Sequence, residues 1–130
     1  MLETQEEVIY LHKIIMEEKS DLLTINGHIL YRHTGTNQYK QLSRKLPSGR
    51  TVRLRVHQVV LLNKLKSVSM PTGCEASHLC HIKNCIAEDH LTAEPHNLNM
   101  ERFHCADERI LRGDPVYCSG HGNYPKCIGM

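Results

Sequence analysis

The hydrophobic and polar positions along the chain change their period several times, and each change marks an expected element. Val8, Leu11, Ile14 and Ile15 recur at helical spacing with Glu and Lys on the opposite face, which predicts an amphipathic helix. This helix should run from about Glu3 to Lys19. Apolar residues return to helical spacing over residues 57–65, where a second helix is expected.

Short β-favouring runs separated by turn signals occupy the stretch between these two helices. Asn26-Gly27 divides the first two runs, and this dipeptide is a strong signal for a hairpin. Further turn signals at residues 35–37 and 47–49 are each followed by another run of the same kind. The pattern predicts an antiparallel β-meander.

The second half of the chain has the pattern of a strand, a loop, a second strand and a helix. An extended piece at residues 75–79 leads into a tight loop, and a second short strand begins at His90. Pro95 suits the first turn of a helix because the N–H group that it lacks would be unpaired there. The helix is therefore expected from about Pro95 to His104, followed by a glycine-containing tail that only a metal would order.

All six cysteines lie in this second half, and histidines are interleaved with them at ligand spacing. They form two sets of three thiolates and one imidazole, a donor set that tetrahedral zinc prefers in structural sites. The first predicted set is Cys74, Cys80, Cys85 and His90, and the second is Cys105, Cys118, His121 and Cys127. His33 or His57 could take the place of Cys74. Two other histidines, His12 and His28, are expected to be structural.

Three disulfides are the alternative arrangement of the six cysteines. The acidic start of the chain is unlike a secretory n-region, and the first half has no cysteine that a disulfide could staple. Thiols persist in reducing compartments, so we expect an intracellular protein, with the nucleus as a compatible location. No apolar run approaches the ~20 residues that span a bilayer, so no membrane partner is expected.

Charge is distributed unevenly along the chain. The formal net charge is +2, but residues 22–74 contain no Asp or Glu. Solubilising surfaces normally mix both signs, so this acid-free segment indicates a surface that binds a polyanion such as nucleic acid. Alternation places Arg53 and Arg55 on one face of their strand and apolar residues on the other, and such a β-ribbon fits the major groove. The expected contact residues are Arg32, Lys40, Arg44, Lys45, Arg50, Arg53 and Arg55.

These patterns together predict one α+β domain over residues 1–130. The chain has no Trp and one Phe, so its core is thin and favours metal staples. Residues 1–70 are expected to form the N-terminal helix and a basic antiparallel β-meander that binds DNA. Residues 71–130 are expected to form a zinc-stapled ββα unit with two zinc sites and a loop-rich zinc-bound tail.

Two residues of the ββα unit carry chemistry outside the zinc sets. Its first strand presents His78, and its helix presents Asn99. An imidazole that takes a proton from water, and an amide oxygen that holds one Mg²⁺ on a phosphate, suffice for phosphodiester hydrolysis. The simpler interpretation is a surface histidine on a zinc loop and a solvated asparagine.

At these positions the chain resembles a known family. The residues Ser77-His78-Leu79-Cys80-His81, Cys85, His90-Leu91, Asn99 and Cys105 look like the motif of the His-Cys box homing endonucleases, which belong to the ββα-metal (His-Me finger) superfamily. The match covers about residues 74–105. The resemblance implies an Mg²⁺-dependent endonuclease that cuts double-stranded DNA and leaves 5′-phosphate and 3′-hydroxyl ends.

The resemblance also implies roles for single residues. His78 would be the general base, Asn99 the ligand of the catalytic Mg²⁺, and Arg53 the arginine near the scissile phosphate. Relatives can dimerise through a C-terminal extension, and no such extension follows Cys127, so homodimerisation is left open. The rival function is a non-catalytic, zinc-stabilised DNA- or RNA-binding module, which would need neither His78 nor Asn99.

Overall fold

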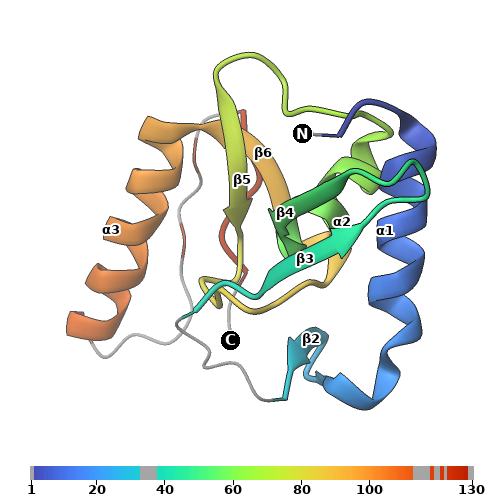
Figure 1. Cartoon of the computed structure of the whole chain (residues 1–130). Coiled ribbons are helices and arrows are strands. Elements are labelled where there is room, and N and C mark those ends of the chain that lie inside the picture. Colours follow the sequence, from blue (N-terminus) through green and yellow to red (C-terminus); the bar gives the residue numbers. More distant parts are fainter. Residues whose placement is uncertain (1, 33–37, 113–117, 119–120, 122, 129–130) are drawn as a thin grey trace.

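The computed structural model describes residues 2–32, 38–112, 118, 121 and 123–128, and for residues 106–112 it describes the backbone alone. The elements in chain order are α1 (Gln5–Glu17), β1 (Leu22–Ile25), β2 (His28–Tyr31), β3 (Gln41–Lys45), β4 (Thr51–Arg55), α2 (Val56–Leu65), β5 (Cys74–His78), β6 (Leu91–Pro95) and α3 (His96–Arg112) (Figure 1). The predicted α+β class is confirmed. None of the described helices is long and apolar enough to cross a membrane.

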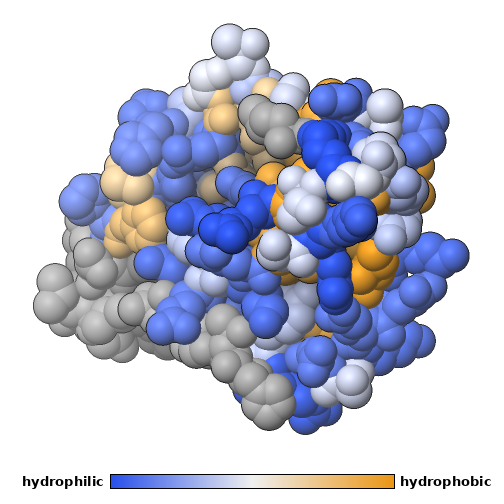
Figure 2. All heavy atoms as spheres, viewed as in Figure 1, coloured by the Kyte–Doolittle hydropathy of each residue, from blue (hydrophilic) through white to orange (hydrophobic). Residues whose placement is uncertain are grey.

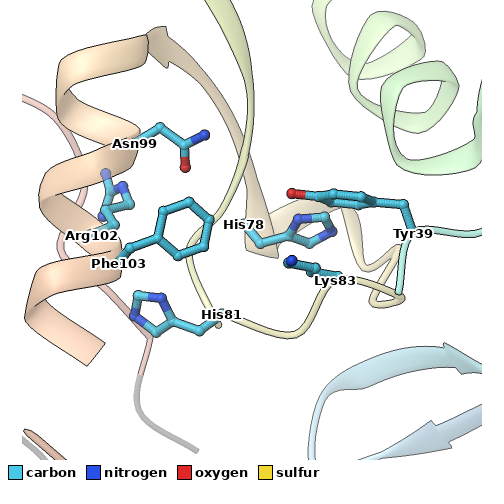
Figure 3. A pocket seen from close by; sticks show the side chains of 7 residues that line it. All are labelled: Tyr39, His78, His81, Lys83, Asn99, Arg102 and Phe103. Atoms are coloured by element: carbon cyan, nitrogen blue, oxygen red, sulfur yellow. The ribbon is translucent and has the colours of Figure 1, made fainter. Parts of the chain in front are cut away.

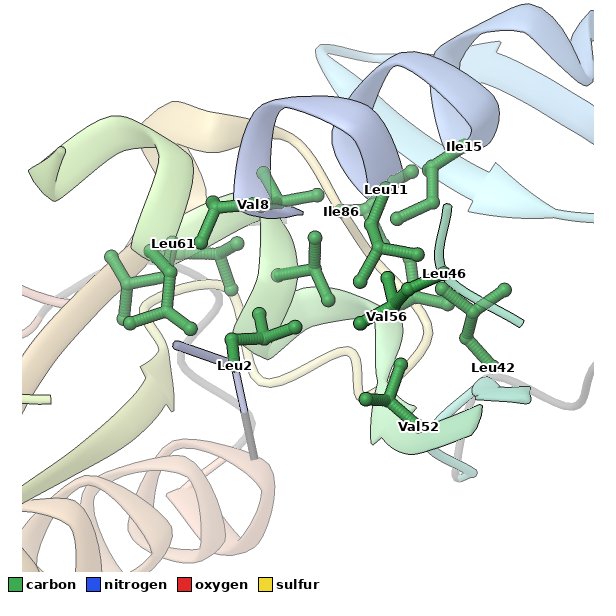
Figure 4. Close-up of a cluster of buried hydrophobic side chains, with 14 of the residues drawn as sticks. Leu2, Val8, Leu11, Ile15, Leu42, Leu46, Val52, Val56, Leu61 and Ile86 are labelled. Carbon is green, nitrogen blue, oxygen red and sulfur yellow. The ribbon is translucent and has the colours of Figure 1, made fainter. Parts of the chain in front are cut away.

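Helix α1 begins at a capping box and packs its apolar stripe on the core. The Thr4 side chain accepts a hydrogen bond from the Glu7 N–H group, and the Glu7 carboxylate accepts one from the Thr4 N–H group. Val8, Leu11 and Ile15 are almost fully buried, as their spacing predicts. They join the hydrophobic cluster that also contains side chains of α2, β3 and β4 (Figure 4).

The predicted β-meander is present as two separate hairpins, in which β1 pairs with β2 and β3 pairs with β4. In a β-meander, β3 would pair with the free edge of β2, but a later part of the chain occupies that edge. Leu30 forms an antiparallel bridge with Cys85, and the Ile86 N–H group donates to the Ile29 carbonyl at 2.8 Å. The segment that contains Cys85 and Ile86 therefore takes the place expected for β3. The predicted turn at residues 35–37 lies outside the described residues.

The β3–β4 hairpin has the two faces that its alternation predicts. Leu42 and Leu54 pair on the core side, while Ser43 and Arg53 pair on the solvent side. Hydrophilic residues lie in the middle of the molecular face on which this hairpin is seen (Figure 2).

The β5–β6 hairpin and α3, which lies beside it in Figure 1, form the predicted ββα unit. Strand β6 extends through Pro95, so this residue closes a strand opposite Cys74 instead of opening the helix. Helix α3 continues to Arg112, beyond the predicted end at His104. The sequence contains no Gly or Pro between Pro95 and Gly113, so nothing in that interval stops the helix.

Candidate active site and metal centres

A pocket opens between the end of β5, the loop that follows it and α3 (Figure 3). The lining residues are Tyr39, His78, His81, Lys83, Asn99, Arg102 and Phe103. The structure thus brings His78 and Asn99, the two residues predicted to carry the chemistry, into one pocket. In Figure 3 the Asn99 oxygen, the Tyr39 hydroxyl and the Lys83 ammonium all point towards the space that they enclose.

His78 is buried and is held in a defined orientation. Its Nε2 lies 2.9 Å from the carbonyl oxygen of Cys85, and a carbonyl can only accept, so Nε2 carries the proton. The neutral ring then has its lone pair on Nδ1, which is the nitrogen available as a base. Burial lowers the pKa of His78 to about 4, so the ring is neutral at pH 7.

Two further rings pack against His78. The His57 ring lies 4.7 Å from it between centroids, and Tyr39 stacks on His57 at 4.8 Å. His57 was an alternative zinc ligand in the sequence analysis, but it lies in this ring stack and is not a member of either Cys/His cluster of the described residues. From the sequence, no role in this pocket was predicted for Tyr39, His57 or Lys83. They come from distant segments without a shared motif, so only the fold reveals that they meet.

Asn99 is held at both ends of its side-chain amide. The Ser77 hydroxyl donates to Asn99 Oδ1 at 2.9 Å, and Asn99 Nδ2 donates to Glu75 Oε1 at 2.6 Å. Glu75 and Ser77 lie two positions apart on β5, so both project from the same face of the strand. The oxygen of the amide is therefore the end presented towards the pocket, and it is the kind of hard ligand that Mg²⁺ accepts.

A first metal-binding cluster lies beside the pocket. Its members are His28, Cys80, Cys85 and His90, whose ligand atoms all lie within 4.8 Å of one another. Cys85 Sγ lies 3.6 Å from Nδ1 of His28 and 3.5 Å from Nδ1 of His90. In a tetrahedral zinc site, Zn–S and Zn–N bonds of about 2.3 and 2.0 Å place sulfur and nitrogen about 3.5 Å apart. The donor set and its spacing therefore fit zinc.

This grouping corrects the predicted fourth member, because His28 stands where Cys74 was expected. Strand β5 is extended, so Cys74 lies roughly 13 Å from His78 at about 3.3 Å per residue, and Cys80 follows beyond His78. The β1–β2 hairpin instead carries His28 to the cluster, since Leu30 of β2 bridges to Cys85. His33, the other alternative, lies outside the described residues.

The second cluster contains the four residues that the sequence predicted. Cys105, Cys118, His121 and Cys127 have ligand atoms within 4.8 Å of one another. His121 Nε2 lies 3.1 Å from Cys118 Sγ and 3.2 Å from Cys127 Sγ. On its other side, His121 Nδ1 donates to the Glu101 carboxylate at 2.8 Å, an arrangement that commonly orients a metal-binding imidazole.

Arg102 connects this cluster to the ββα unit. Its guanidinium is fully buried and donates two hydrogen bonds to the Glu94 carboxylate, at 2.7 and 2.8 Å. It also donates to the Pro125 carbonyl at 2.7 Å and lies 3.5 Å from Cys127 Sγ. One buried ion pair therefore ties β6 and α3 to the tail.

The structure divides the predicted DNA-contact residues into two groups. Arg44 forms an ion pair with Glu18, and Arg50 donates to both oxygens of Glu7 at 2.8 Å. Acids of the N-terminal segment therefore neutralise two arginines that lie in the acid-free part of the sequence. The other five predicted contact residues are exposed: Arg32, Lys40, Lys45, Arg53 and Arg55. Arg53 is not among the described residues that line the pocket.

Comparison with known protein families gives a match over most of the chain. Residues 26–130 match the family described as the zinc-binding loop region of homing endonuclease. No curated protein and no solved structure matches the chain. The matched region contains every member of both Cys/His clusters and all seven residues that line the pocket. The chain therefore belongs to the homing endonuclease family defined by this zinc-binding region, in agreement with its resemblance to the His-Cys box enzymes.

Proposed function

We propose that this protein is a divalent-metal-dependent endonuclease that hydrolyses double-stranded DNA and leaves 5′-phosphate and 3′-hydroxyl ends. The observation that carries the proposal is the pocket shared by His78 and Asn99. There, a neutral imidazole with its lone pair on Nδ1 lies across from an amide whose oxygen points inward. A protein that only bound DNA would need neither group.

In the proposed reaction, Nδ1 of His78 takes a proton from the water that attacks the phosphorus atom. The Nε2–H bond to the Cys85 carbonyl keeps the ring in the required tautomer. This bond also strengthens as the ring becomes positive, which stabilises the imidazolium that forms. The rings of His57 and Tyr39 shield the imidazole from water and restrict its rotation.

Asn99 is the proposed protein ligand of a catalytic Mg²⁺. One neutral oxygen is enough, because Mg²⁺ keeps several waters and takes further oxygens from the phosphate. When bound, the ion stabilises negative charge on the phosphate and on the leaving 3′ oxygen.

Cations at the pocket would hold the scissile phosphate. The Lys83 ammonium lines the pocket, and the Arg55 guanidinium lies 4.5 Å from the centroid of the Tyr39 ring. The family resemblance implied this role for Arg53. We propose Lys83 and Arg55 for it instead, because both lie over the ring of Tyr39, which packs against His78. Arg53 is then a contact to a more distant phosphate.

The two Cys/His clusters are proposed to hold structural zinc. The first fastens β2 to the loop that supplies the Cys85 carbonyl, and the second fastens α3 to the tail. Both depend on thiolates, so a reducing compartment, such as the nucleus, remains the proposed location.

The exposed and the paired arginines should respond differently to substitution. Arg53→Ala and Arg55→Ala should each weaken DNA binding and reduce the slope of log affinity against log salt by about one. Arg50→Ala is the matched control, because its guanidinium is engaged by Glu7. It should lower the thermal midpoint and leave that slope unchanged. Equal slopes for all three variants and the wild type would place the DNA surface elsewhere.

The proposed function is tested with supercoiled plasmid. The purified protein should nick or linearise plasmid in Mg²⁺ but not in EDTA, and DNA ligase should reseal the nicks without other treatment, as 5′-phosphate and 3′-hydroxyl ends require. If no divalent metal supports cleavage of DNA or RNA, the nuclease assignment is wrong. The rival function, a zinc-stabilised binding module, would then account for the basic hairpin.

A further inference from the structure

Glu75 is the acidic member of a continuous chain of hydrogen bonds that includes Asn99. Its Oε1 accepts from Asn99 Nδ2 at 2.6 Å and lies 3.0 Å from Nδ1 of His96. Ser77 completes the chain by donating to Asn99 Oδ1. His96, Glu75, Asn99 and Ser77 therefore form a relay of hydrogen bonds between β5 and α3, which runs from the exposed His96 to the buried Ser77.

The chemistry of this relay sets the direction in which the amide faces. An asparagine amide can exchange its nitrogen and oxygen by rotation, but an ionised carboxylate accepts hydrogen bonds and cannot donate them. The nitrogen of Asn99 must therefore face Glu75, and the oxygen must face the other way. Reversal would present an NH₂ group to a cation. The charge of the carboxylate also polarises the amide and makes its oxygen a better ligand.

Packing does not explain the presence of Glu75. Its side chain is 40% exposed, and that of His96 is 70% exposed. Glu94, which lies directly opposite Glu75 on β6, is different: it is fully buried in the ion pair with Arg102 and stabilises the fold. A solvent-exposed glutamate is ionised at neutral pH, so the carboxylate that the relay requires is present.

We propose that Glu75 is a positioning residue for a hard divalent cation, such as Mg²⁺, and acts through the side-chain amide of Asn99. The inference rests on the proposed function, in which Asn99 is the metal ligand. Glu75 does not touch the cation. It fixes the end of the amide that the cation meets, with His96 holding the carboxylate in place.

The first test measures the Mg²⁺ concentration that gives half-maximal plasmid nicking. Glu75→Gln can still accept from Asn99 but can also donate, so it no longer selects one orientation of the amide. The Mg²⁺ concentration that gives half-maximal nicking should rise about 10- to 100-fold in Glu75→Gln, which is the usual effect of losing a hydrogen-bond partner of a metal ligand. This concentration should rise further in Glu75→Ala. The rate at saturating Mg²⁺ should recover towards wild type. Asp89→Asn, which removes an exposed acid outside the relay, should match the wild type.

The second test does not depend on cleavage. Mn²⁺ is titrated into ¹⁵N-labelled protein, and paramagnetic broadening of the Asn99 side-chain amide signals is followed by NMR. The midpoint should shift upward in Glu75→Gln by a factor similar to the Mg²⁺ shift. If Glu75→Gln had wild-type midpoints in both titrations, the inference would be overturned. It would also be overturned if Glu75→Gln lost activity at every Mg²⁺ concentration and also lost zinc or melted at a lower temperature, because Glu75 would then support the fold. If the wild-type protein cut nothing but the midpoint of the Mn²⁺ titration still depended on Glu75, the positioning role would stand and the nuclease function would be rejected.

Discussion

Replacing His78 with alanine should leave a folded protein that binds DNA and barely cuts it. The ring contributes one hydrogen bond to the Cys85 carbonyl and lies outside both Cys/His clusters, so both zinc sites should survive. Cleavage should fall by ~10²–10⁴-fold, because that is the usual contribution of a general base. Plasmid nicking at saturating Mg²⁺ measures the loss, and a gel-shift assay measures the retained affinity.

The matched control for this experiment is His104→Ala. His104 is exposed on α3 and is not among the described residues of the pocket, so its loss should change neither zinc content nor nicking. Zinc analysis and a thermal melt on both variants separate lost chemistry from lost structure. If the His78→Ala protein cut as fast as the wild type, the protein would still be a nuclease. A group other than His78 would then take the proton from water.

The sequence predicted the local parts of the active site because their residues lie close together in the chain. His78, Cys80 and Cys85 occupy one strand and the loop that follows it, so their spacing alone restricts where they can meet. The second cluster was also predictable in composition, since its last three members fall within ten residues of one another. Strand alternation likewise placed Arg53 and Arg55 on the solvent face.

What the sequence could not predict depends on pairings between distant segments. His28 reaches the first cluster because β2 lies against the loop that ends at Cys85, a contact that leaves no periodic signal. The same contact separates the expected meander into two hairpins. The acid-free segment suggested that all its cations face DNA, but Arg50 folds onto Glu7, an acid more than forty positions away. The distribution of charge along the sequence does not show which acids the fold brings next to a basic residue.

Removing one ligand of the first cluster should have the largest effect on stability. Zinc binding to such sites is worth on the order of 10 kcal/mol, which is comparable to the entire ~5–15 kcal/mol stability of a domain. The hydrophobic cluster formed by Cys80, Cys85 and Ala87 is small, so apolar packing alone is a weak substitute. Cys85→Ser should therefore lose the zinc and unfold the ββα unit, with loss of both nicking and the cooperative thermal transition.

Cys74→Ser is the matched control, since it removes a thiol that lies outside both clusters. Elemental analysis should find two zinc ions per chain in the wild type and in Cys74→Ser, with equal melting temperatures. His28→Ala should behave like Cys85→Ser, although His28 lies in the N-terminal part of the chain, far from the cysteines in sequence. The opposite result, in which Cys74→Ser loses zinc and His28→Ala keeps it, would restore the ligand set expected from sequence. It would also require β5 to leave its pairing with β6, because the extended strand keeps Cys74 opposite Pro95.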